Sequence, residues 1–108
     1  MDHLDRYDRI LRLVAEENPE EFYASLKEKL EGTHDFPEDY LYKFIITNDE
    51  AKITEIYRAF DDVKFTLTTR DSKNGKYTSI SINAFVLDAD QVIKIYQIVG
   101  KIPGVIML

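Results

Sequence analysis

The most regular alternation of apolar and polar residues in this chain lies on either side of the dipeptide Asn74-Gly75. Asn-Gly is a strong signal for a two-residue β-hairpin turn of type I′, because both central residues of that turn have positive φ. Such a turn places Lys73 opposite Lys76, and all other pairs follow by counting outward. The apolar pairs are Thr69–Ile80, Leu67–Ile82, Phe65–Ala84 and Val63–Val86, and the mostly polar pairs are Arg70–Ser79, Thr68–Ser81, Thr66–Asn83 and Lys64–Phe85. A slip of one residue would put both faces out of phase, so the turn and the alternation predict the same hairpin.

Three other segments repeat apolar residues every three or four positions, which is the spacing of one face of an α-helix. They cover residues 19–31, 48–60 and 88–100. Each has a residue at or just before its start whose side chain caps helix N-termini well. These caps are Asn18, Asn48 and Asp88. Gly32 and Gly100 are suited to the C-terminal ends of the first and third helices.

Two strands complete the pattern, one at residues 40–47 and a short one in the closing "PGVIML". From residue 40 the predicted order is strand, helix, strand, strand, helix, strand. Two right-handed crossovers onto one antiparallel sheet give an α+β fold, the ferredoxin-like βαββαβ sandwich, with strand order 4-1-3-2. Both helices cover one face of the sheet and leave the other open. We therefore expect a single domain over residues 19–108, with a leading helix at about 19–31.

Residues 1–18 precede this domain as an amphipathic helical extension. Its apolar stripe consists of Leu4, Tyr7, Leu11 and Val14. A helix this short is marginal alone, so the stripe needs a surface to cover. The open face of the sheet offers one, because the predicted register points Phe85 and Leu87 toward it and Ile45 can join them. Packing within the chain and contact with a second copy or a partner both stay open.

Composition narrows the classes of protein that the chain can belong to. Its length of 108 residues is typical of one domain, and its lack of cysteine excludes disulfides and thiolate metal sites. The charged N-terminus does not match a signal peptide, and no apolar run approaches a membrane span, which predicts a cytoplasmic protein without a membrane partner. The net charge of −6 repels nucleic acid and disfavours it as a partner.

The sequence offers little that could perform catalysis. Its two histidines are His3 and His34, and His34 stands beside Asp35 in a predicted loop. Neighbours in sequence do not form a catalytic pair in space, and the acidic pairs elsewhere fit turns and helix caps. We found no glycine-rich phosphate loop, no metal-ligand spacing and no nucleophile with a nearby base. The sequence therefore predicts a protein that is not an enzyme and holds no cofactor or metal.

Four segments agree in order and spacing with a known family. They are "FYASLKEKLEG", "FPEDYLYKFII", "SKNGKYTSISI" and "IYQIVGKIPGVIML". The most specific part is the hairpin pattern Ser-Lys-x-Gly-x-Tyr-x-Ser at residues 72–79. Over about residues 22–108 the chain resembles the YbeD-like family of small bacterial proteins of unknown function. The resemblance implies a ferredoxin-like fold similar to ACT-type regulatory domains, which bind small metabolites between paired domains, although the junction "ITNDEAK" lacks the glycine typical of ACT ligand loops.

The hairpin is a local exception to the acidic balance, because within residues 63–78 four basic residues stand against Asp71 alone. These basic residues can simply protect the edge of the sheet from pairing with another chain, which requires no binding function. Alternatively, they can bind an anionic partner. We favour a small non-enzymatic regulatory or adaptor domain that binds another protein through its basic hairpin and open sheet face. The expected contact residues are Lys64, Arg70, Lys73, Lys76 and Tyr77. The alternative is an ACT-like module that senses a small metabolite, with a homodimer also open.

Overall fold

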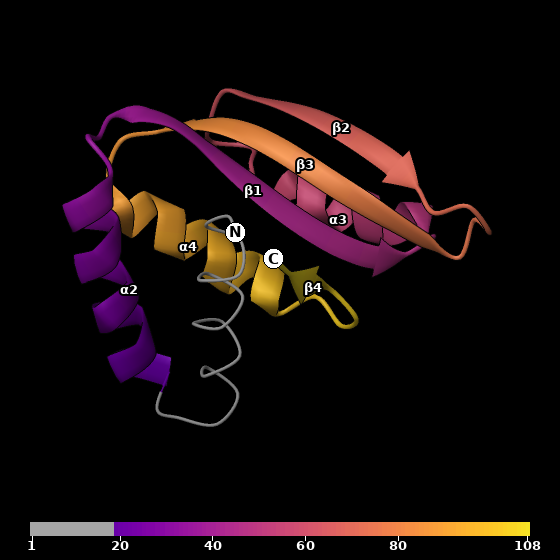
Figure 1. The fold of residues 1–108 in the computed structure, drawn as a ribbon, viewed down its shortest axis with the longest axis horizontal. Helices are drawn as coiled ribbons and strands as arrows, with labels where there is room; N and C mark the ends of the chain where they lie inside the picture. The colour runs from indigo at the N-terminus through magenta and orange to yellow at the C-terminus, as the bar shows by residue number, and fades with distance from the viewer. Residues whose placement is uncertain (1–18) are drawn as a thin grey trace.

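The computed structural model describes residues 19–108, so the predicted N-terminal helix and the Asn18 cap lie outside the described residues. Within this range the elements follow the predicted order (Figure 1). They are α2 (Pro19–Thr33), β1 (Glu38–Thr47), α3 (Glu50–Arg58), β2 (Phe65–Asp71), β3 (Tyr77–Val86), α4 (Ala89–Gly100) and β4 (Ile106–Met107). None of these helices is long and apolar enough to cross a membrane.

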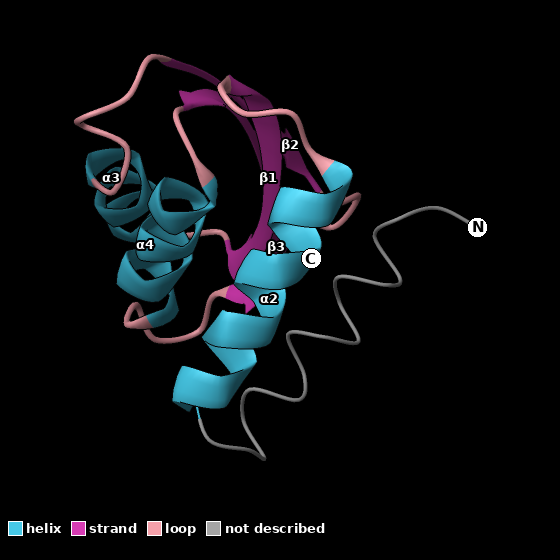
Figure 2. Ribbon diagram, turned by 90° about the vertical axis from the view of Figure 1, so that its left-hand side faces the viewer, coloured by secondary structure: helices cyan, strands magenta, loops and turns pink. Residues whose placement is uncertain are grey.

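The four strands form one antiparallel sheet in the order β2-β3-β1-β4, which is the predicted 4-1-3-2 order counted from the opposite edge. Helices α3 and α4 lie on one face of this sheet (Figure 2). Helix α2 packs against α4 near the end of the sheet where β1 begins (Figure 1). The ferredoxin-like α+β fold is therefore confirmed. We call the opposite face, which carries Lys43, Ser81 and Phe85, the open sheet face.

The β2–β3 hairpin has the predicted register, with Phe65 opposite Ala84 and Arg70 opposite Ser79. The predicted alternation also holds, because every second residue of β3 is buried in the core from the middle of the strand onward. These buried residues are Ile80, Ile82, Ala84 and Val86. The predicted pair Val63–Val86 is not part of the ladder, because β2 begins at Phe65.

The turn of this hairpin is not the predicted type I′ turn. Its last hydrogen bond joins the Ser72 N–H to the Tyr77 carbonyl oxygen at 2.9 Å, so residues 73–76 form the loop. Lys73 and Lys76 therefore do not pair across the ladder. The register is still the predicted one, because the longer loop is centred on the same two residues as the two-residue turn.

The side chain of Asn74 explains the change of turn. Its Oδ1 accepts hydrogen bonds from the Ser72 hydroxyl at 2.8 Å and from the Lys76 N–H at 3.0 Å. Within residues 19–108 no residue other than glycine has positive φ, so Asn74 lacks the conformation that a type I′ turn requires, and Gly75 alone in this loop supplies it at 70°. A side-chain hydrogen bond of this kind is a common way to build a turn around Asn.

The predicted cap of the second helix is wrong by one residue. Asp49 caps α3, and its carboxylate accepts a hydrogen bond from the Ala51 N–H at 2.9 Å. Asn48 instead donates its side-chain amide to the Gly75 carbonyl oxygen at 3.1 Å. Asn48 therefore ties the end of β1 to the hairpin loop and is not available as a cap.

The ends of the other two helices lie close to their predicted positions. Asp88 caps α4 as predicted, since its carboxylate accepts a hydrogen bond from the Gln91 N–H at 2.8 Å. The Gln91 side chain accepts one in return from the Leu87 N–H at 2.8 Å, which is close to a capping box. Helix α2 continues to Thr33, one residue past the predicted stop at Gly32, because Gly32 does not adopt the positive φ that ends many helices.

Tyr42 of β1 lies at the centre of the hydrophobic core. Its side chain is fully buried, and its ring centroid lies 5.0 Å from those of Phe60 and Tyr96. Its hydroxyl donates to the Val92 carbonyl oxygen at 3.2 Å, which satisfies the buried donor. Burial raises the pKa of Tyr42, so the phenol stays neutral. This residue joins the sheet to α4 by packing and by a hydrogen bond.

Two glycines give a matched test of the turn. Gly75→Ala should lower the free energy of unfolding by about 1 kcal/mol, because alanine disfavours positive φ. Gly32→Ala should raise it by roughly 0.5 kcal/mol, because a Cβ there meets no atom within 4 Å and alanine suits a helix better. Urea unfolding followed by circular dichroism measures both. Equal effects of the two changes would contradict this account of the turn.

Candidate functional site

Four of the five predicted contact residues lie together at the hairpin tip, which we define as residues 70–77. Arg70 lies near the end of β2, Lys73 and Lys76 lie in the loop, and Tyr77 begins β3. All four side chains are exposed, that of Tyr77 by 40%. The Lys76 ammonium lies 5.4 Å from the centroid of the Tyr77 ring, within cation–π range. The tip thus presents cations and an aromatic ring on one projection.

The hairpin tip carries three cations and one acidic residue, Asp71, so positive charge is in excess there. The Asp71 carboxylate accepts a hydrogen bond from the Thr78 hydroxyl at 2.9 Å, across the ladder. Among the acidic side chains of residues 19–108, none forms an ion pair with Lys73 or Lys76. The ammonium groups of both lysines are therefore available to an anionic group from outside.

The structure separates Lys64, the fifth predicted contact residue, from the hairpin tip. Lys64 precedes β2, and its carbonyl oxygen accepts a hydrogen bond from the Phe85 N–H at 2.9 Å. It lies six residues from Arg70 along an extended chain, which corresponds to roughly 20 Å. Both residues belong to the open-face side, as predicted, but at opposite ends of it.

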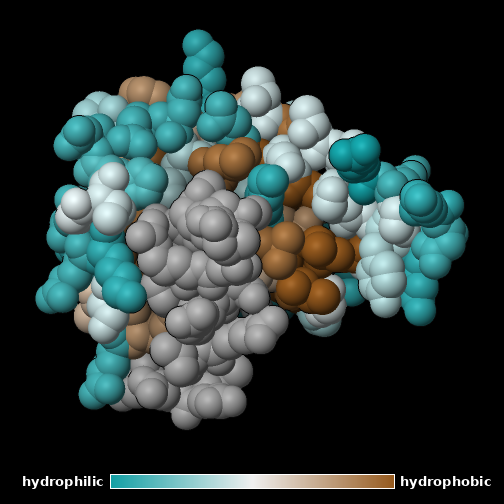
Figure 3. All heavy atoms as spheres, viewed as in Figure 1, coloured by the Kyte–Doolittle hydropathy of each residue, from teal (hydrophilic) through white to brown (hydrophobic). Residues whose placement is uncertain are grey.

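The open sheet face also carries an apolar strip, which we define as Leu41, Ile45, Phe85 and Ile106. Leu41 is 46% exposed, Phe85 44% and Ile106 52%. Figure 3 views this face and shows hydrophobic residues gathered in patches among hydrophilic ones. The sequence predicted Phe85 and Leu87 on this face and named Ile45 as a residue that can join them. Leu87 is exposed one residue beyond the end of β3. Leu41 and Ile106 were missed because the phase of β1 and the position of β4 were not assigned.

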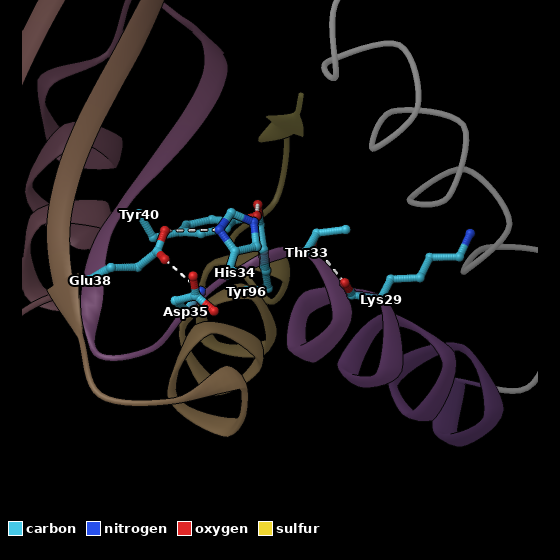
Figure 4. A network of polar contacts seen from close by, with 7 residues as sticks. All are labelled: Lys29, Thr33, His34, Asp35, Glu38, Tyr40 and Tyr96. Atoms are coloured by element: carbon cyan, nitrogen blue, oxygen red, sulfur yellow. Dashed lines mark hydrogen bonds and ion pairs between the residues drawn. The ribbon is translucent and has the colours of Figure 1, made fainter.

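A second polar cluster lies at the other end of β1, around His34 (Figure 4). The Nδ1 atom of His34 lies 3.0 Å from a carboxylate oxygen of Glu38, and the other oxygen accepts the Asp35 N–H at 2.8 Å. The His34 ring packs between Phe36 and Tyr40, with centroid separations of 5.6 Å and 5.4 Å. His34 therefore pairs with Glu38 and not with its sequence neighbour Asp35.

This cluster fastens the loop between α2 and β1 to the core. Beneath it, the buried hydroxyl groups of Tyr40 and Tyr96 lie 2.9 Å apart and join β1 to α4. The hydrogen bond from His34, and then that from the Asp35 N–H, hold the pKa of Glu38 below its ordinary value. Across residues 19–108, no three His, Asp or Glu side chains gather as metal ligands would. The arrangement has a structural role that its contacts explain.

The Glu38 carboxylate should make stability depend on pH. Since its pKa is lowered on folding, its contribution is fully present above the ordinary value of 4.5 and is lost as pH falls through the folded value. The stability difference between wild type and Glu38→Gln should therefore shrink on acidification below 4.5. Urea unfolding across a pH series measures it, with Glu55→Gln on the exposed surface of α3 as the control. A difference that grows on acidification would contradict this role.

Comparisons with known proteins agree with the fold. The family model described as "Protein of unknown function (DUF493)" matches residues 31–108. Among solved structures, the chain is similar to that of protein HP0495 from H. pylori, with a TM-score of 0.57 and 24% identity over 70% of this chain and 86% of that chain. No curated protein matches. The family model covers well over half of the chain, so the chain belongs to the DUF493 family, which is the YbeD-like family that the resemblance predicted.

Proposed function

We propose that this chain is a small regulatory or adaptor domain without enzymatic activity, and that it binds another protein through the hairpin tip and the adjoining open sheet face. The observation that carries the proposal is the gathering of exposed cations on one projection of a protein whose net charge is −6. Arg70, Lys73 and Lys76 create a local field opposite to that of the whole molecule. Such a field orients an approaching partner and selects an acidic surface.

The side chains of the hairpin tip suit a protein partner in particular. Arg70 can bind a carboxylate through two parallel hydrogen bonds, which gives direction as well as charge. Tyr77 adds an exposed aromatic ring, and aromatic and arginine side chains carry much of the binding energy at protein interfaces. We therefore expect the partner to present carboxylates around an apolar residue that packs on Tyr77.

The hairpin tip is also held in place before a partner arrives. Asn48 donates one hydrogen bond from its side chain to Gly75, and its backbone N–H donates another to the Lys76 carbonyl oxygen at 3.0 Å. A surface that is already ordered loses less conformational entropy on binding. The domain would act by favouring one state of its partner, with no chemistry of its own. Lys64 would contribute only to a partner that spans the length of the open sheet face.

Charge reversal at the hairpin tip tests this proposal. The double variant Lys73→Glu with Lys76→Glu should weaken partner binding by roughly tenfold, because two attractive contacts become repulsive, while the fold is retained. Wild type and variant are used as bait in a host lysate, and captured proteins are identified by mass spectrometry. The candidate partner is then purified and titrated against both forms at low and high salt.

The control is the double variant Lys29→Glu with Lys94→Glu, which makes the same change of charge on the exposed surfaces of α2 and α4. A partner lost by the hairpin variant and kept by this control supports the proposal. Equal affinity of all three forms removes the hairpin tip from the interface. Capture of no partner, with thermal stabilisation by one compound from a metabolite panel, would favour the ACT-like alternative instead.

A further inference from the structure

The apolar strip of the open sheet face crosses strands β3, β1 and β4. Leu41 of β1 lies opposite Asn83 of β3, and Phe85 is the next residue of β3 on the same face. Ile45 of β1 lies opposite Ile106 of β4. Phe85 lies opposite Asp39 and Ile106 lies opposite Ile45, so the strip extends over six residue positions of β1 and is about 20 Å long. A helix that covered it would need an apolar stripe of similar length.

We propose that residues 1–18 of the same chain cover this strip as an amphipathic helix. The stripe formed by Leu4, Tyr7, Leu11 and Val14 measures about 15 Å from its first to its last residue along a helix axis, so it is somewhat shorter than the strip and can cover part of it. Burial of both surfaces removes apolar area from water and offsets the cost of ordering a short helix.

The connection to α2 has the reach that this packing requires. Helix α2 has 15 residues, so it extends about 22 Å, and it ends near the start of β1 (Figure 1). Residues 16–18 suffice for the turn of an antiparallel helix pair. A helix over residues 4–15 that runs back beside α2 is about 18 Å long. Its far end therefore returns to the first half of β1, where Leu41 lies.

The charges of the two surfaces are complementary. On the open sheet face, Lys43 lies between Leu41 and Ile45, Lys64 lies beside Phe85, and Asp39 lies opposite Phe85, so two cations and one carboxylate border the strip. The part of the segment that returns to β1, residues 2–8, carries three acidic side chains and one arginine. These are Asp2, Asp5 and Asp8 against Arg6. Each exposed pair contributes little, but together such pairs favour this surface over the acidic helical side of the domain.

This packing does not depend on the proposed partner contact. It covers the apolar strip and leaves the hairpin tip exposed. A partner bound at the tip would therefore reach the strip only by displacing residues 1–18.

Introduced cysteines test the proposal directly, because the chain contains none. The pair Leu4→Cys with Asn83→Cys places one thiol at the far end of the stripe, which returns to the first half of β1, and one opposite Leu41 and next to Phe85 on the same face. Mild oxidation of this variant at low concentration should give an internal disulfide at least about tenfold faster than in the control pair Leu4→Cys with Glu55→Cys, whose second thiol lies on α3. Intact mass and non-reducing gels distinguish internal from intermolecular bonds.

Three results would overturn the proposal. Equal rates for the two pairs would show that residues 1–18 have no preferred place. A disulfide that joins two chains and depends on concentration would assign the strip to a second copy. No disulfide in the test pair, with protection of the thiol at position 83 only when a purified partner is added, would assign the strip to that partner.

A second variant keeps the test independent of introduced thiols. Phe85→Asp changes a side chain that is 44% exposed, so the core should stay folded. It should speed amide hydrogen exchange in residues 4–15 by about tenfold, the factor that a loss of about 1.4 kcal/mol produces, while exchange in β3 and α4 stays slow. Unchanged exchange in residues 4–15 would contradict their packing on Phe85.

Discussion

The pairing of β1 with β3 is the interaction on which the rest of the structure depends. These two central strands pair along their full length, from Glu38 opposite Val86 to Thr47 opposite Tyr77. Because their alternation is in phase, all core residues of both strands face the same side and offer α3 and α4 one continuous apolar surface. The hairpin tip lies at one end of this pairing, and the cluster around His34 lies near the other.

Much of the fold could be predicted because its signals are local and periodic. The register of the hairpin follows from an alternation of period two, and the strand order follows from two right-handed crossovers. The errors in the cap of α3 and in the hairpin turn arise where side-chain hydrogen bonds decide between alternatives that the sequence leaves equal. Asn48 and Asp49 are both good helix caps, and the choice depends on Gly75, a distant residue whose carbonyl oxygen accepts the Asn48 amide. Likewise, the dipeptide Asn74-Gly75 is typical of a type I′ turn, but the Asn74 side chain accepts a hydrogen bond from the Ser72 hydroxyl and belongs to a longer loop.

The candidate site could be predicted in part, and for a similar reason. Alternation along β2 correctly assigned Lys64 and Arg70 to the same face, but a shared face is not a shared site, because six residues of extended chain place the two at opposite ends. His34 and Glu38 have the spacing of a helical pair, yet they lie across the junction of a loop and a strand. Their contact depends on how Phe36 and Tyr40 hold the histidine ring, which sequence periodicity does not encode.

Asn48 and Asp49 give the hairpin tip a mechanical property. Asn48 bonds to the hairpin tip, and Asp49 bonds to the first turn of α3. Two structures that are distant in sequence are therefore held by adjacent residues, which share one peptide unit. The direction in which the cations point is therefore set by the whole junction of strand and helix. Substitutions in the first turn of α3 can change that direction while every residue of the hairpin stays the same.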